Sequence, residues 1–327
     1  MSTPASTPEI PDVTAPFGGR SQVADLNGPV HYVVFDGPKG DEPPFVLVHG
    51  LGGSHVNWVL LGERLARRRT VYALDLGGHG FTRAFHHSPS VRTNAELVRR
   101  FIEEVVGEPS VVVGNSMGGL ITTLVASRAN APVLGAVLVN PALPAPPFRP
   151  DAQARSLGTL LATPLVEIVR SKTGKPMSRD ERIKAVLDIC IHDTKRLHQG
   201  ALEAHVISGR AQRGFTELQA AFREAARTMI AALARRRVVR HRLAQIAVPV
   251  LLIHGDRDRL VHVAAARWAA QVNPHWRYVE FADVGHVPML EVPDETAEVI
   301  ESWYADEVVG GGEGTRAAFR VRPGRRA

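Results

Sequence analysis

The chain has 327 residues, 44% of them hydrophobic and 22% charged, a balance that is typical of a globular protein and excludes a largely disordered chain. This length is enough for one large domain with an insertion, or for two domains. The single cysteine, Cys190, excludes an intramolecular disulfide, and no apolar run approaches the roughly 18 residues that cross a membrane. Because a lone cysteine fits a reducing compartment, we expect a cytoplasmic protein.

The net charge of +6 comes largely from two arginine-rich segments, residues 223–242 and 310–327. We find no basic motif interleaved with aromatic residues of the kind that binds RNA, so we expect no nucleic-acid partner. We interpret the excess charge as a solvated basic surface. A weak association with a membrane or lipid surface through these two segments is the alternative.

The first 20 residues are rich in Ser, Thr, Ala and Pro and lack the basic start and apolar core of a secretory signal. We expect them to form a disordered lead-in. Between residues 21 and 36, apolar and polar residues alternate on both sides of Asn27-Gly28. An Asn-Gly pair between two alternating segments predicts a β-hairpin.

From residue 45 onward, short apolar runs alternate with segments of helical spacing. The runs predict buried strands at residues 45–48, 71–74, 111–113 and 136–139. The segments between them predict helices at residues 56–68, 90–106 and 120–127. This alternation predicts βα units that build a parallel sheet.

A proline-rich linker begins at residue 141, and the alternation breaks there. Residues 151–242 contain no convincing strand, and helices are predicted at 157–170, 179–191, 195–210 and 216–240. The alternation resumes with strands at 248–253 and 278–281, a helix at 263–272, and a final helix from residue 293 to 306. We therefore divide the chain into a disordered lead-in (1–20), an α/β core (21–143 and 244–306), a helical insertion (144–243) and a basic, disordered tail (307–327).

The centre of the pattern is residues 111–121, where a β-branched run leads through Gly114-Asn115-Ser116-Met117-Gly118 into a helix. A tight strand-to-helix turn of this kind lifts a serine hydroxyl clear of the backbone, and the flanking glycines remove Cβ atoms that would collide. The backbone N–H of Met117 stands at the helix start, where it can hold an oxyanion. For this motif alone, the alternative is an ordinary turn with a serine helix cap.

Four loops follow strands at the sheet edge where open α/β sheets bind ligands. Loop 49–54 is glycine-rich and lets backbone donors approach a ligand, and the other three loops carry Ser116, Asp258 and His286. A serine needs a base to take its proton, a histidine is such a base near neutral pH, and a carboxylate orients the histidine. The four loops together predict an acyl-transfer site in the chain order Ser, Asp, His.

This arrangement resembles the α/β-hydrolase fold family over residues 21–306. The resemblance implies a mostly parallel twisted sheet flanked by helices, with Ser116 as the nucleophile, Asp258 as the acid and His286 as the base. It also implies oxyanion donors at the N–H groups of Leu51 and Met117. The insertion then corresponds to the family's helical cap, which shapes the acyl pocket, and neither a metal nor an organic cofactor is needed.

Other polar residues in these loops compete for roles in the site. Asp256 competes with Asp258, but the family's spacing from Gly255 fits Asp258. Asn140 takes the position where some members carry the acid, and its amide cannot ionise. We expect structural roles for the remaining polar residues of these loops, namely His49, His79, His254 and Asp283.

The serine at the turn argues against haloalkane dehalogenases and epoxide hydrolases of this fold, which use an aspartate at this position. The turn also resembles that of the meta-cleavage-product hydrolases, which split carbon–carbon bonds. Those enzymes usually have a tryptophan after the catalytic histidine, where this chain has Val287. We expect Val287 and Met289, together with Gly50 and Gly52, to bind the substrate in an apolar acyl pocket.

We therefore expect a serine hydrolase of the esterase or lipase type that cleaves carboxylic esters of apolar acyl groups through an acyl-enzyme. Its expected partner is a small-molecule ester. Carbon–carbon bond hydrolysis of the meta-cleavage-product type is the second hypothesis. A ligand-binding receptor or scaffold on the same fold is the non-enzymatic hypothesis, which stoichiometric rather than catalytic turnover would favour.

Overall fold

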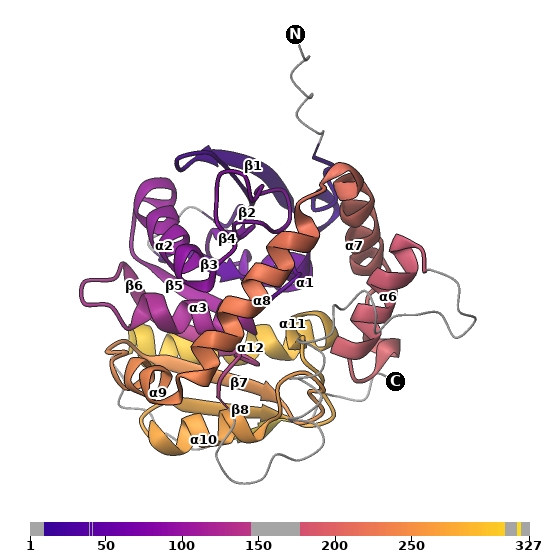
Figure 1. The fold of residues 1–327 in the computed structure, drawn as a ribbon. Coiled ribbons are helices and arrows are strands. Elements are labelled where there is room, and N and C mark those ends of the chain that lie inside the picture. Colours follow the sequence, from indigo (N-terminus) through magenta and orange to yellow (C-terminus); the bar gives the residue numbers. More distant parts are fainter. Residues whose placement is uncertain (1–9, 39, 41, 145–176, 311–318, 322–327) are drawn as a thin grey trace.

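The computed structural model describes residues 10–38, 40, 42–144, 177–310 and 319–321 (Figure 1). The strands within these residues are β1 (Gly19–Asp25), β2 (Pro29–Phe35), β3 (Phe45–Val48), β4 (Val71–Leu74), β5 (Ser110–Asn115), β6 (Val133–Val139), β7 (Val250–Gly255), β8 (Arg277–Phe281) and β9 (Phe319–Val321). They form one sheet in the order β1-β2-β4-β3-β5-β6-β7-β8-β9. The β1–β2 and β2–β4 pairs are antiparallel, and all the others are parallel.

Helices connect the strands and pack on the sheet (Figure 1). Those that the structure describes are α1 (Val59–Leu65), α2 (Val91–Phe101), α3 (Met117–Ala126), α6 (Arg179–Cys190), α7 (Gln199–Ala211), α8 (Leu218–Ala234), α9 (Arg236–Ala244), α10 (Ala264–Val272), α11 (Pro288–Glu291) and α12 (Pro293–Trp303). Within the described ranges, none of the helices has the length and apolar character to cross a membrane.

The central strands are buried on both faces of the sheet. Along β3, Val46 and Val48 belong to one core cluster, and Phe45 and Leu47 belong to the other. The first cluster includes residues of α2, α3, α8, α9 and α10, and the second includes residues of α1, α11 and α12. Because successive side chains of a strand point to opposite faces, covering both faces requires a continuous apolar run. The mostly parallel α/β sheet predicted from such runs is confirmed.

The predicted hairpin is confirmed, and its turn has the expected backbone. β1 and β2 pair from Gly19 opposite Phe35 to Asp25 opposite Pro29. Asn27 has a φ of 66° and Gly28 a φ of 125° between them. Three residues, Leu26 to Gly28, connect the strands, and asparagine and glycine adopt positive φ values most readily.

The prediction of a disordered lead-in is wrong for residues 10–20. Ala15–Phe17 form a short 3-10 helix, β1 begins at Gly19, and the side chains of Val13 and Phe17 are buried in the core. These two apolar side chains offset the cost of ordering a segment whose Ser, Thr and Pro content is typical of disorder. Residues 1–9 lie outside the described residues.

The prediction of a disordered tail is wrong for residues 307–309, which end a π-helix (Tyr304–Val309), and for residues 319–321, which form β9. Phe319 pairs with Val279 and Val321 with Phe281, in a parallel register with β8. Without β9, the outer side of β8 would carry unpaired backbone N–H and C=O groups, which can pair with a further strand. The rest of the tail beyond residue 310 lies outside the described residues.

The insertion contributes α6, α7, α8 and α9 between β6 and β7 of the sheet, and no strand occurs among residues 177–249. In Figure 1, α8 runs diagonally across the front of the molecule, with α6 and α7 beside it. The single helix predicted at 216–240 is two helices, because the backbone of Arg235 leaves the helical region with a ψ of 55°. The helix predicted at 157–170 lies outside the described residues.

Candidate active site

Ser116 stands at the turn between β5 and α3. Its backbone has a φ of 55° and a ψ of −117°, a conformation that L residues rarely adopt. Two hypothetical Cβ distances show how tight the turn is. A Cβ atom at Gly118 would lie 2.0 Å from the carbonyl oxygen of Val48, and one at Gly114 would lie 2.3 Å from the Gly118 oxygen. Both positions therefore require glycine. The Ser116 side chain remains partly exposed in this turn, while Met117 beside it is fully buried.

His286 and Asp258 form a buried hydrogen-bonded pair in the loops that follow β8 and β7. Nδ1 of His286 lies 2.7 Å from Oδ2 of Asp258, and the two residues are 4% and 5% exposed. Because an ionised carboxylate can only accept, Nδ1 carries a proton, and Nε2 of a neutral ring is free to act as a base. His286 and Ser116 line the same cavity.

Asp258 is held ionised by its neighbours. Oδ1 accepts the backbone N–H groups of Leu260 and Val261 at 2.7 and 2.9 Å, and Oδ2 also accepts the Asn140 amide at 2.8 Å. Burial by itself would raise the pKa of Asp258. Attraction and hydrogen bonding to His286 and His254 outweigh burial and hold the pKa of this carboxyl well below its usual range.

Asp256 and Asn140, the two other candidates for the acid position, make structural hydrogen bonds instead. Oδ1 of Asp256 accepts the backbone N–H of Asp283 at 2.7 Å, so this carboxylate ties two loops together. Asn140, at the alternative acid position, donates to Oδ2 of Asp258 and to the carbonyl of Gly285 at 3.2 Å. The sequence indicates that Asn140 cannot ionise, but no pattern in it signals this bridging contact.

Loop 49–53 is built around a neutral histidine. The fully buried His49 ring donates from Nδ1 to the Gly50 carbonyl at 2.8 Å and accepts the Leu76 N–H at Nε2 at 3.0 Å. Burial, followed by the neighbouring His79, lowers the pKa of His49 to about 3. The ring is therefore uncharged near neutral pH, and it joins the backbone of this loop at Gly50 to the loop after β4 at Leu76.

This loop packs against the serine turn. A Cβ atom at Gly50 would lie 3.0 Å from Cβ of Ser116, and Gly52 has a φ of 71°. Gly50, Leu51 and Gly52 all line the cavity. At the other side of the serine, Met117 is the first residue of α3, where backbone N–H groups have no intrahelical partner. Its side chain packs in the core, so only its backbone is available to the site.

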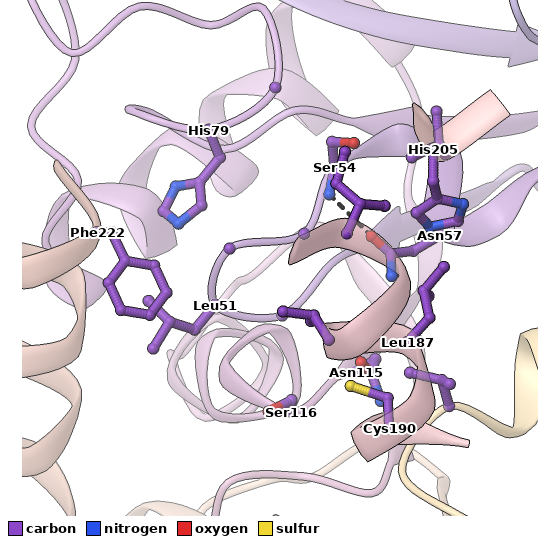
Figure 2. Close-up of a pocket in the computed structure, with 18 of the residues that line it drawn as sticks. Leu51, Ser54, Asn57, His79, Asn115, Ser116, Leu187, Cys190, His205 and Phe222 are labelled. Atoms are coloured by element: carbon purple, nitrogen blue, oxygen red, sulfur yellow. Dashed lines mark hydrogen bonds between the residues drawn. The ribbon is translucent and has the colours of Figure 1, made fainter. Parts of the chain in front are cut away.

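The cavity beside Ser116 has a volume of about 430 Å³, within the usual range for small-molecule sites. Its floor comes from the sheet loops and its roof from the insertion: Figure 2 shows Leu51 and Ser116 on one side, with Leu187 and Cys190 of α6 on the other. Val287 lines the cavity as expected. Met289 does not, because it is fully buried in the core cluster of α11 and α12. The other apolar residues that line the cavity include Val56, Ile183, Val186, Ile189, Leu218, Phe222, Met229, Leu233 and Val261.

The insertion is attached directly to the loop of His286. The N–H of His286 donates to the carbonyl of Cys190 at 2.6 Å. Glu291, only 2% exposed, accepts the N–H groups of Gly285, His192 and Asp193 at 2.8, 3.0 and 3.0 Å. No pattern in the sequence indicates this role for Glu291. Burial raises the pKa of the Cys190 thiol to about 12, so this thiol is no nucleophile near neutral pH.

Two further histidines reach the cavity wall, and both are labelled in Figure 2. Nδ1 of His79 faces the Gly77 carbonyl at 3.1 Å, and Nδ1 of His205 faces the Ala201 carbonyl at 2.7 Å. Because a carbonyl only accepts, each Nδ1 carries the proton, and each Nε2 has no hydrogen-bond partner among the described residues. Burial lowers the pKa of both rings, to about 4 for His205. The sequence indicates a turn at His79 but not a position on the cavity wall.

A cluster of potential metal ligands lies outside the cavity lining, at His31, His55 and Asp75. Nδ1 of His31 lies 2.7 Å from Oδ2 of Asp75, and Nδ1 of His55 lies 3.0 Å from both carboxylate oxygens. Asp75 also accepts the N–H groups of His55 and Phe81 at 2.7 and 2.9 Å. These separations are those of hydrogen bonds, so hydrogen bonding accounts for the cluster.

Comparisons with known proteins identify the family and the fold of the chain. A family model described as the alpha/beta hydrolase family matches residues 45–299. The pimeloyl-(acyl-carrier protein) methyl ester esterase of Chromobacterium violaceum is 30% identical over 256 residues, which cover 77% of this chain and 90% of that protein.

Two solved structures share the fold. A membrane phospholipase A, described as a bacterial virulence factor, superposes with a TM-score of 0.69 and 26% identity, covering 91% of this chain and 89% of that one. The 2-hydroxy-6-oxo-6-phenylhexa-2,4-dienoate hydrolase of a Rhodococcus species superposes with a TM-score of 0.67 and 21% identity, covering 88% and 100%. With the family model spanning most of the sheet and its loops, the chain belongs to the alpha/beta hydrolase family.

Proposed function

We propose that the protein is a serine esterase that hydrolyses carboxylic esters of apolar acyl groups, with Ser116, His286 and Asp258 as its catalytic triad. The observation that carries the proposal is the 2.7 Å contact between His286 and Asp258 beside the cavity that Ser116 and His286 both line. The strained backbone of Ser116 supports it, because such strain persists where a side chain must be presented for reaction.

The proposed reaction follows from these positions. Nε2 of His286 takes the proton of Ser116 as Oγ attacks the ester carbonyl, and Asp258 stabilises the resulting imidazolium. The N–H groups of Leu51 and Met117 hold the oxyanion of the tetrahedral intermediate. His286 then protonates the leaving alcohol. In the second half, a water attacks the acyl-enzyme with His286 again as the base, which regenerates Ser116.

The cavity supports an apolar acyl group as the bound part of the substrate. Its lining from α6 and α8 is largely aliphatic or aromatic, and Val287 follows His286 directly at its edge. Gly50 and Gly52 leave room for the carbonyl end of the substrate beside the serine turn. The Chromobacterium violaceum relative is named for the methyl ester of an acyl chain, which fits a small alcohol as the leaving group.

Steady-state hydrolysis of methyl and p-nitrophenyl esters of increasing acyl length tests this function. We expect multiple turnovers, a preferred acyl length set by the cavity, and a loss of several orders of magnitude in kcat for Ser116→Ala. Ser127→Ala, which changes the serine directly after the last residue of α3, is the matched control.

Two outcomes would favour the other hypotheses. Turnover of a vinylogous diketone but of no ester, lost in Ser116→Ala, would establish carbon–carbon bond hydrolysis. Ligand binding with no turnover of either substrate class, by folded protein, would establish a binding role on this fold.

A further inference from the structure

Arg179 and Arg182 bring positive charge to an otherwise largely apolar cavity. Both lie in α6, both are half-buried, and both line the cavity. Arg179 donates to the Gly209 carbonyl of α7, and Arg182 donates to the Met177 carbonyl at 3.1 Å. These bonds fix the direction of each guanidinium while leaving most of its five N–H donors available.

Among the described residues, both arginines bond to backbone carbonyls and neither has a carboxylate partner. The two acidic residues in the same turn of α6 are engaged elsewhere: Asp180 pairs with Arg210, and Glu181 accepts the N–H of Ser178 at 2.7 Å. Burial lowers the pKa of Arg179, and the charges of Arg182 and Arg213 lower it further. Several positive charges that lie close together without a neighbouring carboxylate favour the binding of an anion.

The position of the two arginines along α6 gives the distance to the proposed catalytic centre. The last residue of α6, Cys190, accepts the N–H of His286, so this end of the helix lies at the reacting groups. A rise of about 1.5 Å per residue puts Arg182 roughly 12 Å along the helix axis from Cys190. The lining residues between them are apolar, namely Ile183, Val186, Leu187 and Ile189.

We propose that Arg179 and Arg182 form an anion subsite that binds a carboxylate at the end of the substrate remote from the reacting ester carbonyl. The apolar face of α6 then covers the chain that joins the two ends. A guanidinium binds a carboxylate through paired, charge-assisted hydrogen bonds, which gives this end of the cavity its selectivity. The proposal rests on the proposed esterase function and names its substrate class.

The test compares charged and uncharged substrates of equal length. In the first series, monomethyl esters of straight-chain dicarboxylic acids carry a carboxylate on the acyl side, and the dimethyl esters of the same acids are the uncharged controls. In the second series, acetyl esters of ω-hydroxy acids carry the carboxylate on the alcohol side, and acetyl esters of plain alcohols are the uncharged controls. We expect a higher kcat/KM for the carboxylate-bearing ester on one of the two sides, with a distinct optimum in chain length.

The double variant Arg179→Gln/Arg182→Gln should lower the ratio of charged-ester to neutral-ester kcat/KM by about tenfold or more, mainly through KM. Lys184→Gln removes one charge from an exposed position of the same helix outside the cavity lining, and should leave the ratio unchanged. An unchanged ratio in the double variant, or a neutral ester preferred at every length by the wild type, would overturn the subsite.

A binding measurement separates this proposal from the esterase function. Calorimetric titration of the Ser116→Ala protein with the monomethyl esters should give salt-sensitive binding that the added Arg179→Gln/Arg182→Gln changes weaken about tenfold or more. Such binding without any ester turnover by the wild type would sustain the subsite and overturn the esterase. Ester turnover without charge selectivity would sustain the esterase function and overturn the subsite.

Discussion

At the scale of single residues, Asp258 is the most constrained polar group of the candidate site. Its carboxylate accepts from Asn140, Leu260, Val261 and His286, all within 2.9 Å. All four partners donate a hydrogen bond to Asp258, so the side chain at this position must accept at both of its oxygens. Its environment thus requires an ionised acid, which is what the orientation of His286 in the proposed triad needs.

Asp258→Asn should lower kcat by about 10²–10⁴-fold, because the new NH₂ group would face the donors of His286 or of the backbone and displace the histidine proton from Nδ1. Asp256→Asn should keep most of the activity, because the amide that replaces this carboxylate retains an oxygen that accepts the N–H of Asp283. Steady-state kinetics on one ester for both variants, with circular dichroism to confirm folding, checks the ranking. A larger loss for Asp256→Asn would make Asp256 the acid.

The sequence predicts a site residue well when the pattern that indicates it lies within a few neighbouring residues. Ser116 lies between glycines whose spacing is set within one turn, and Asp258 and His286 each follow a recognisable buried strand. Asn140 and Glu291 act through contacts to residues far away in the chain. No spacing rule encodes such contacts, because they form only when separate elements pack.

At the scale of elements, the end of α6 and the loop of His286 behave as one unit. Glu291 of α11 accepts from Gly285, just before His286, and from His192 and Asp193, just after α6. Charge-assisted bonds to three backbone donors in a buried site are stronger than neutral ones. One carboxylate therefore fixes the position of the proposed base relative to the roof of the cavity.

Glu291→Gln should reduce the free energy of unfolding by about 1–3 kcal/mol, because its NH₂ group replaces an acceptor and leaves buried N–H donors unpaired. It should also lower kcat/KM, because the loop of His286 loses its anchor to the insertion. Urea unfolding and ester kinetics measure the two effects. Glu298→Gln, exposed on α12, is the matched control. A Glu291→Gln protein with normal stability and kinetics would contradict this role.

The elements that the sequence predicts best are the buried strands, since β3 and β4 coincide with the predicted residues 45–48 and 71–74. The helices are predicted less well where tertiary contacts determine their ends. The break at Arg235 has no proline or glycine to signal it. Strand β9 forms because β8 offers an open edge, and that edge exists only after the sheet has assembled.

At the scale of the whole molecule, burial of neutral histidines links stability to pH. Burial lowers the pKa of His31, His49, His79 and His205, to about 3 for His49 and about 4 for His205. In the unfolded chain these rings bind protons below their ordinary pKa of about 6.5. The unfolded state therefore binds more protons than the folded state as the pH falls below 6.5, and acidification favours unfolding. The depressed pKa values of Asp75 and Asp258 add to this loss once the pH falls below about 4.

The free energy of unfolding should thus decline from about pH 7 to pH 5, with each of these histidines contributing a slope of up to about 1.4 kcal/mol per pH unit. Urea unfolding followed by fluorescence at several pH values measures the slope. His205→Gln removes one titrating ring at the cavity wall and should reduce the slope by up to about 1.4 kcal/mol per pH unit. His241→Gln, exposed on α9, is the matched control. A free energy of unfolding that stays constant over this range would show that these rings take up protons equally in the folded and unfolded chain, which would contradict their burial as neutral groups.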